Sequence, residues 1–274
     1  MPFCETKDSV AIYYDDTGTG RPLVFVHGWS FSGAVWRVQR EFFSTRYRCI
    51  SPDLRGHGNS SAPSSGYGVH ELARDVTTLF ESLDLSGATL VGWSLGVLVA
   101  LSSYPALKDR LAALVFVSGT PKFTASEDFP FGLPAKETRG LALRLRRNRE
   151  SALEDFSRMM FAPHELSGHD FEMLNRDSIL TAKRPGLDAA LQTLEALALA
   201  DMRSVLGCIR VPVLLVHGDK DRICLPESSY YMAASMPHAS LSVLNGAGHA
   251  PQLSRSEEFN SRMTGFLAGV YGNN

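Results

Sequence analysis

The chain has 274 residues, of which 44% are hydrophobic and 20% are charged, and its formal net charge is −2. This length suits one hydrophobic core with an insertion, and the near-neutral charge gives no reason to expect a nucleic-acid partner. The first residues lack a signal segment, and no apolar stretch approaches the length of a membrane span, so no membrane partner is expected. The four cysteines are scattered without metal-ligand spacing. We therefore expect free thiols in a cytoplasmic protein and no metal site.

Short apolar segments alternate with helical patterns along most of the chain. Residues 1–20 favour an antiparallel hairpin. Strands are expected in segments that are apolar and rich in β-branched residues, near 22–27, 47–51, 88–91, 111–117, 211–217 and 240–244. Helices are expected near 34–44, 69–84, 95–104, 226–236 and 255–270. Buried strands separated by helices predict a mostly parallel sheet covered on both faces, with a site at the carboxyl ends of its strands.

This alternation stops between residues 122 and 200, where no convincing strand pattern is present. The segment shows helical periodicity interrupted by prolines and glycines. We therefore expect a helical cap over 122–200, inserted into a core formed by 1–121 and 201–274. Such a cap would exclude water and shape the substrate pocket.

Ser94 lies at the centre of Gly92-Trp93-Ser94-Leu95-Gly96, which has the G-x-S-x-G pattern of a nucleophile elbow. An apolar strand pattern ends at Gly92, and a helical pattern begins just after Ser94. A turn this tight strains the serine backbone and excludes larger neighbours, so glycines flank it. The motif predicts a nucleophilic hydroxyl held above the sheet edge at the N-terminus of a helix.

A serine nucleophile needs a base and an acid that orients the base, and in this arrangement they follow in the order Ser, acid, His. His249 lies in a glycine-flanked loop after the last predicted strand, and we expect it to act as general base and then as general acid. The acid is either Asp219 or Asp221. The spacing from Gly218 and the downstream Pro226 favour Asp221. Asp219 would then bind backbone N–H groups in a turn.

An oxyanion hole in this arrangement uses the N–H of the residue after the nucleophile, here Leu95, and an N–H from the loop after an earlier strand. The loop His27-Gly28-Trp29 follows the strand expected at 22–27, which makes the Trp29 N–H the second donor. Several histidines lack a neighbouring acid and serine and are expected to be structural or surface residues: His57, His70, His164, His169, His217 and His238.

Basic residues are concentrated within the expected cap, where residues 136–149 contain six Lys and Arg and one Glu. If 141–160 is one helix, apolar residues share one face, among them Phe156 and Met160. Arg144, Arg147 and Arg158 fall on the other. One interpretation is a solvated face with local pairs such as Glu154–Arg158. The other is a docking patch for an acidic partner.

Together these residues resemble the α/β-hydrolase superfamily, and more narrowly the pimeloyl-[acyl-carrier-protein] methyl ester esterases of biotin synthesis. The narrower resemblance rests on Trp93 in the elbow, on Val-Ser-Gly-Thr-Pro-Lys-Phe at 117–123, on Gly-Ala-Gly-His-Ala-Pro at 246–251 and on the stretch from Thr193 to Arg203. It implies the α/β-hydrolase fold with a cap and removal of a methyl group from a pimeloyl thioester on acyl carrier protein.

The same resemblance implies roles for individual residues. It carries substrate contacts over to Trp29, Ser94, Leu95, His249 and the cap stretch that includes Phe156 and Met160. It also implies docking of the acidic carrier on basic cap residues, for which the candidates are Arg139, Arg144, Arg147 and Arg158. The reaction needs no cofactor.

The chain departs from the family pattern at two positions. Val97 replaces a second glycine after the elbow, and we expect it to crowd the helix packing beneath the serine. Asp155 stands where a basic residue is expected. Two alternatives stay open: a small-molecule carboxylesterase or enol-lactonase, and a ligand sensor that retains the triad.

Overall fold

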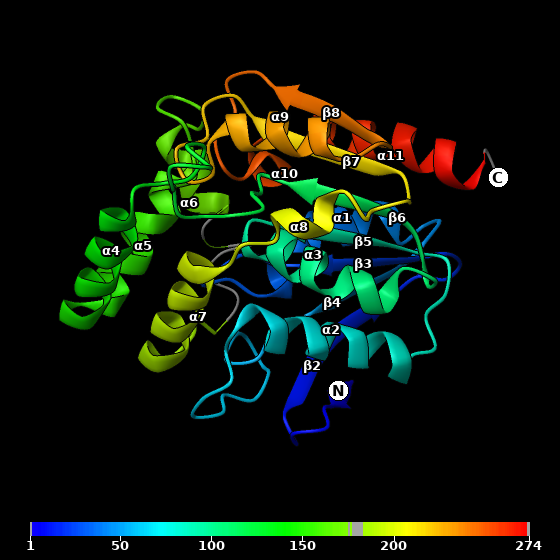
Figure 1. Ribbon diagram of the computed structural model, residues 1–274, viewed down its shortest axis with the longest axis horizontal. Coiled ribbons are helices and arrows are strands. Elements are labelled where there is room, and N and C mark those ends of the chain that lie inside the picture. The colour runs from blue at the N-terminus through cyan, green and yellow to red at the C-terminus, as the bar shows by residue number, and fades with distance from the viewer. Residues whose placement is uncertain (1, 175, 177–182, 273–274) are drawn as a thin grey trace.

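The computed structural model describes residues 2–174, 176 and 183–272, and it is built around an eight-stranded sheet with the order β1-β2-β4-β3-β5-β6-β7-β8 (Figure 1). The strands are β1 (Phe3–Glu5), β2 (Ala11–Thr17), β3 (Pro22–Val26), β4 (Arg48–Pro52), β5 (Ala88–Trp93), β6 (Leu111–Val117), β7 (Val213–Gly218) and β8 (Ala239–Leu244). β1 and β2 form the expected antiparallel hairpin, and neighbours from β4 to β8 run parallel. The predicted α/β-hydrolase architecture is confirmed.

Helices cover both faces of this sheet, which is why β3, β5 and β7 are buried along their whole length. Figure 1 shows α2 and α3 in front of the sheet and α1 and α11 behind it. The core helices are η1 (Gly33–Trp36), α1 (Arg37–Phe43), α2 (Val69–Ser82), α3 (Leu95–Leu107), α8 (Arg203–Leu206), α9 (Pro226–Ser235), α10 (Pro251–Ser254) and α11 (Ser256–Tyr271). No helix in the described part of the chain is long and apolar enough to cross a membrane.

Between β6 and β7 the chain forms a group of helices beside the carboxyl ends of the central strands (Figure 1). They are α4 (Ala135–Arg147), α5 (Arg149–Met159), α6 (Gly168–Leu174) and α7 (Leu187–Leu199). A continuous helix over 141–160 is not observed. The chain turns at Asn148, whose backbone is extended and whose side chain accepts a hydrogen bond from the Ser151 N–H at 3.1 Å. Asn148 therefore caps α5 and separates it from α4.

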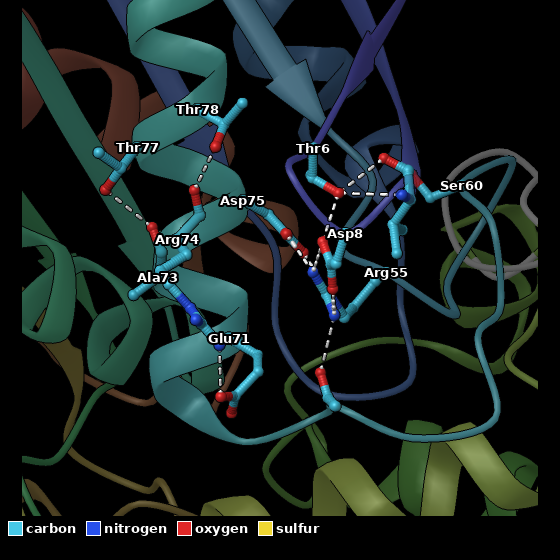
Figure 2. A network of polar contacts seen from close by, with 12 residues as sticks. Thr6, Asp8, Arg55, Ser60, Glu71, Ala73, Arg74, Asp75, Thr77 and Thr78 are labelled. Atoms are coloured by element: carbon cyan, nitrogen blue, oxygen red, sulfur yellow. Dashed lines mark hydrogen bonds and ion pairs between the residues drawn. The ribbon is translucent and has the colours of Figure 1, made fainter.

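Arg55 joins three parts of the fold that are distant in sequence (Figure 2). Its guanidinium binds the buried carboxylate of Asp75 in α2, with an Nε–Oδ2 distance of 2.7 Å, and the half-exposed carboxylate of Asp8 in the β1–β2 turn at 2.9 Å. It also donates to the carbonyl of Gly66 at 3.1 Å. These contacts fasten the hairpin and the loop before α2 to the core.

Candidate active site

The turn between β5 and α3 places Ser94 in a conformation that side-chain-bearing residues rarely adopt, with φ 54° and ψ −115°. A Cβ on Gly92 would lie 2.4 Å from the carbonyl oxygen of Gly96, and a Cβ on Gly96 would lie 2.4 Å from that of Val26. Only glycines fit at these two positions. The close packing keeps the turn sharp and presents the Ser94 hydroxyl at the start of α3.

The structure brings Ser94, His249 and Asp221 together in one hydrogen-bonded chain. His249 Nε2 lies 2.9 Å from Ser94 Oγ, and His249 Nδ1 lies 2.8 Å from Asp221 Oδ2. A proton on Nδ1, facing the carboxylate, leaves Nε2 free to accept the proton of the serine hydroxyl. This is the arrangement that base-assisted attack by a serine requires.

Asp221 is held as a carboxylate by its surroundings. Burial raises the pKa of this carboxyl, but its attraction to His249 and its hydrogen bonds with His217 and His249 hold the pKa well below the usual range. The second oxygen, Oδ1, accepts the N–H groups of Ile223 at 2.8 Å and Cys224 at 3.0 Å. The fixed negative charge can therefore orient His249.

The competing carboxylate, Asp219, points elsewhere and accepts the N–H of Gly246 at 2.6 Å. His217, expected to be a structural or surface residue, is buried beside the acid: its Nε2 lies 3.1 Å from Asp221 Oδ2 and 2.8 Å from the Cys224 carbonyl oxygen. The only sequence signal for this contact is the position of His217 at the end of the strand that precedes the acid.

The predicted oxyanion donors lie on either side of Ser94. Leu95 is the first residue of α3, so its N–H has no carbonyl partner within the helix. The loop that carries Trp29 lies against the elbow, because a Cβ on Gly28 would be 3.2 Å from Ser94 Cβ. Among the described residues, no acceptor is found for the N–H of either Leu95 or Trp29. Neither N–H is therefore engaged by another described group, as the donors of an oxyanion hole would require.

Comparison with known proteins identifies the family. Residues 21–256 match the family model described as the alpha/beta hydrolase fold, which covers most of the chain. The chain belongs to the α/β-hydrolase family.

Relatives of this chain carry several names. It is 30% identical to a non-heme chloroperoxidase from Kitasatospora aureofaciens, over 97% of this chain and 99% of the relative. It is 32% identical to a pimeloyl-[acyl-carrier protein] methyl ester esterase from Nitrosomonas europaea, over 91% of this chain and 96% of the relative. An esterase structure from Exiguobacterium antarcticum superposes with a TM-score of 0.90 at 28% identity, covering 97% of this chain and 98% of that one.

A cavity of about 660 Å³ lies between the sheet and the inserted helices of this α/β-hydrolase, and Ser94 is part of its wall. Most of the lining is apolar and includes Trp29, Phe123, Leu133, Leu141, Phe156, Met159, Leu194, Leu197 and Ile223. Five charged residues also line it: Glu137, Arg144, Asp155, Arg158 and Arg222. The described residues contain no group of three or more His, Cys, Asp or Glu placed to hold a metal ion.

Three of the six predicted substrate-contact residues, Trp29, Ser94 and Phe156, line this cavity, whereas Leu95, His249 and Met160 do not. Trp29 packs edge-on against Phe156 with ring centroids 4.9 Å apart, and its indole N–H donates to the Ala190 carbonyl of α7 at 3.0 Å. The side chains of Leu95 and Met160 are fully buried outside the cavity lining. Met160 instead offers its carbonyl oxygen to the His249 N–H at 2.6 Å.

The four cap arginines proposed for docking are not equivalent. Arg144 and Arg158 line the catalytic cavity, whereas Arg139 lines a separate cavity between α4 and α7. Arg147 is exposed and lies outside the lining of both of these cavities. Arg222, which sequence reasoning missed because it follows the acid in an otherwise ordinary loop, joins Arg144 and Arg158 in the lining.

The packing around Arg158 and Val97 bears on the remaining expectations. Arg158 forms the ion pair with Glu154 expected for a solvated face, at 3.1 Å, and its guanidinium lies 4.7 Å from the ring centroid of Phe171. Val97 is fully buried and packs against Gly119, where a Cβ would lie 2.4 Å from Val97 Cγ2. The missing side chain at Gly119 therefore makes room for the valine beneath the serine.

Proposed function

We propose that this protein is a serine carboxylesterase that works through an acyl-enzyme, and that its substrate is pimeloyl-[acyl-carrier-protein] methyl ester in biotin biosynthesis. The observation that carries the proposal is the hydrogen-bonded chain from Asp221 through His249 to Ser94 at a strained elbow. A hydroxyl so placed serves acyl transfer, because the base can remove its proton as the carbonyl is attacked.

In the proposed reaction, His249 takes the proton from Ser94 as Oγ attacks the ester carbonyl carbon. The N–H groups of Trp29 and Leu95 stabilise the oxyanion of the tetrahedral intermediate. His249 then gives its proton to the leaving alkoxide, which departs as methanol and leaves an acyl-serine. A water molecule, deprotonated by His249, attacks the acyl-serine carbonyl, and His249 then returns the proton to Ser94 Oγ as the acyl–oxygen bond breaks and the carboxylic acid is released. Asp221 stays ionised throughout and stabilises the imidazolium.

Three features support the choice of substrate. Relatives with 28% and 32% identity are named pimeloyl-[acyl-carrier protein] methyl ester esterases. The apolar walls of the cavity suit an aliphatic acyl chain. The arginines of α4, which include Arg139 and Arg147, would attract an acidic carrier protein.

The experiment compares a carrier-linked pimeloyl methyl ester with a free short-chain ester. We expect Ser94→Ala to abolish turnover of both. We expect the double charge reversal Arg139→Glu with Arg147→Glu to lower kcat/KM for the carrier-linked ester by about tenfold or more, and to spare the free ester because neither residue lines the catalytic cavity. Arg262→Glu on α11, remote from the cap, is the matched control.

Other outcomes identify the alternatives. Rapid turnover of free esters or enol-lactones with no response to the charge reversal would favour a small-molecule hydrolase. Negligible Ser94-dependent turnover over a broad ester panel, together with ligand-dependent binding of a partner, would favour a sensor. Peroxide-dependent halogenation that requires Ser94 would place the protein with its chloroperoxidase-named relatives.

A further inference from the structure

The loop that carries His249 is fastened to the inserted helices as well as to the sheet. The N–H of His249 donates to the Met160 carbonyl, which follows α5, at 2.6 Å. The preceding N–H, that of Gly248, donates to Glu165 Oε2 at 2.9 Å. Two consecutive amides of the histidine loop are thus bound by the short segment 160–165, which links α5 to α6.

The Glu165 carboxylate lies at the centre of this arrangement. Oε2 also accepts the N–H of Ala162 at 2.6 Å, and Oε1 accepts the hydroxyl of Ser254 in α10. The three donors come from the linker itself, from the histidine loop and from the helix after it. No ion pair of Glu165 is found among the described residues, so its charge is balanced by hydrogen-bond donors rather than by a cation.

The approach of the two segments is close enough to require a glycine. A Cβ on Gly248 would lie 2.4 Å from the Met160 carbonyl oxygen and 2.9 Å from the Ala162 nitrogen. The histidine loop therefore cannot shift toward the linker, and the Glu165 hydrogen bonds keep it from moving away. The histidine loop is also held through the core, because the His249 carbonyl accepts the Trp93 indole N–H at 2.8 Å.

We infer that Glu165 is a positioning residue for His249, acting through the Gly248 amide and Ser254, so that the cap must be docked for the base to reach Ser94. The inference rests on the proposed role of His249. Displacing a reacting group by about 1 Å can cost on the order of 100-fold in rate. Loss of the carboxylate should therefore appear in kcat, because Glu165 does not line the catalytic cavity.

The test measures kcat, KM and the rate at which a fluorophosphonate labels Ser94. We expect Glu165→Ala to lower kcat and the labelling rate by about 10- to 100-fold with KM within about threefold. We expect Glu165→Gln, which keeps an oxygen for the two amides, to restore most of the loss. Glu172→Ala, an exposed carboxylate in α6, is the matched control and should leave kcat unchanged.

Hydrogen exchange of the Gly248 and His249 amides gives a readout that does not depend on substrate, and we expect faster exchange in Glu165→Ala than in Glu165→Gln. A wild-type kcat in Glu165→Ala, or an equal loss in Glu172→Ala, would overturn the inference. If Glu165→Ala does not fold, Glu165→Asp, with its shorter reach, takes its place under the same criteria. Failure of the proposed function is distinct, because it appears as absent Ser94-dependent turnover in the wild type.

Discussion

Replacing Arg55 by methionine should destabilise the fold by about 3–5 kcal/mol, the usual cost of leaving one member of a buried ion pair without its partner. The side chains of Arg55 and Asp75 are only 3% and 2% exposed. Two guanidinium nitrogens bind the two oxygens of Asp75, and a hydrogen bond to a charged group contributes about 1.5–3 kcal/mol. The loss of two such hydrogen bonds is therefore similar in size to the cost of breaking the buried ion pair. Methionine keeps much of the apolar volume, so the loss measures the unpaired carboxylate.

The assay is urea unfolding, in which the transition midpoint should fall while the dependence on urea concentration stays constant. Asp8→Asn is the matched control, because Asp8 is 57% exposed and its pair with Arg55 should contribute less than about 1 kcal/mol. The double variant Arg55→Met with Asp75→Leu should recover much of the stability, since no buried charge remains.

The same variant should respond to pH in a defined direction. Burial already raises the pKa of Asp75 in the wild type, against the opposing effect of Arg55. Without Arg55 the folded-state pKa rises further above the unfolded value of about 3.9, so the folded state takes up a proton first and gains stability as pH falls toward 4. The deficit relative to the wild type should therefore shrink on acidification. A loss below about 1 kcal/mol that does not change with pH would refute the reasoning.

Three further predictions concern buried groups. Burial lowers the pKa of His27 to about 3 and that of His57 to about 4. Because the unfolded chain binds protons first below about pH 6.5, the free energy of unfolding should decrease by about 1.4 kcal/mol per histidine for each pH unit of acidification. His57→Phe should remove the contribution of one histidine to this pH dependence, measured by urea unfolding at several pH values. Gly119→Ala should destabilise by about 1–3 kcal/mol through its clash with Val97, and Val97→Gly, which also removes the Val97 Cβ that would lie 2.7 Å from the new Cβ, should relieve the clash. Burial raises the pKa of the Cys224 thiol well above its usual range, so iodoacetamide should label it only after unfolding, as mass spectrometry can show.

The elbow and its partners could be predicted because each is a local pattern. Ser94 sits between a strand and a helix, and the spacing from Gly218 distinguishes Asp221 from Asp219. The alternation of strands and helices likewise fixed the parallel sheet. The break between α4 and α5 at Asn148 was not predicted, because an apolar periodicity continues across it. The break depends on a single side chain, that of Asn148, which accepts the Ser151 N–H at the start of α5.

Contacts between distant segments were beyond the reach of local patterns. Glu165 has no motif, and its meeting with Gly248 and Ser254 is set by how the linker after α5 docks on the core. Arg222, in the loop after β7, lines one cavity with residues of α4, α5 and α7 that are distant from it in sequence. Such contacts depend on tertiary packing, and the residues that form them have no fixed spacing along the sequence by which they could be recognised.

The cap contacts both halves of the proposed machinery. On one side, the Ala190 carbonyl of α7 accepts the indole N–H of Trp29, and Phe156 of α5 packs against the Trp29 ring. The loop that carries Trp29 therefore contacts the inserted helices directly. On the other side, the Met160 carbonyl and Glu165 bind the loop of His249. Ser94 is positioned by the core, through β5 and α3, and the contacts of Asp221 are likewise with core residues. A substitution that loosens the cap should therefore displace the base and the Trp29 donor from a nucleophile and a Leu95 N–H that stay in place, and reduce kcat even for a substrate too small to touch the cap.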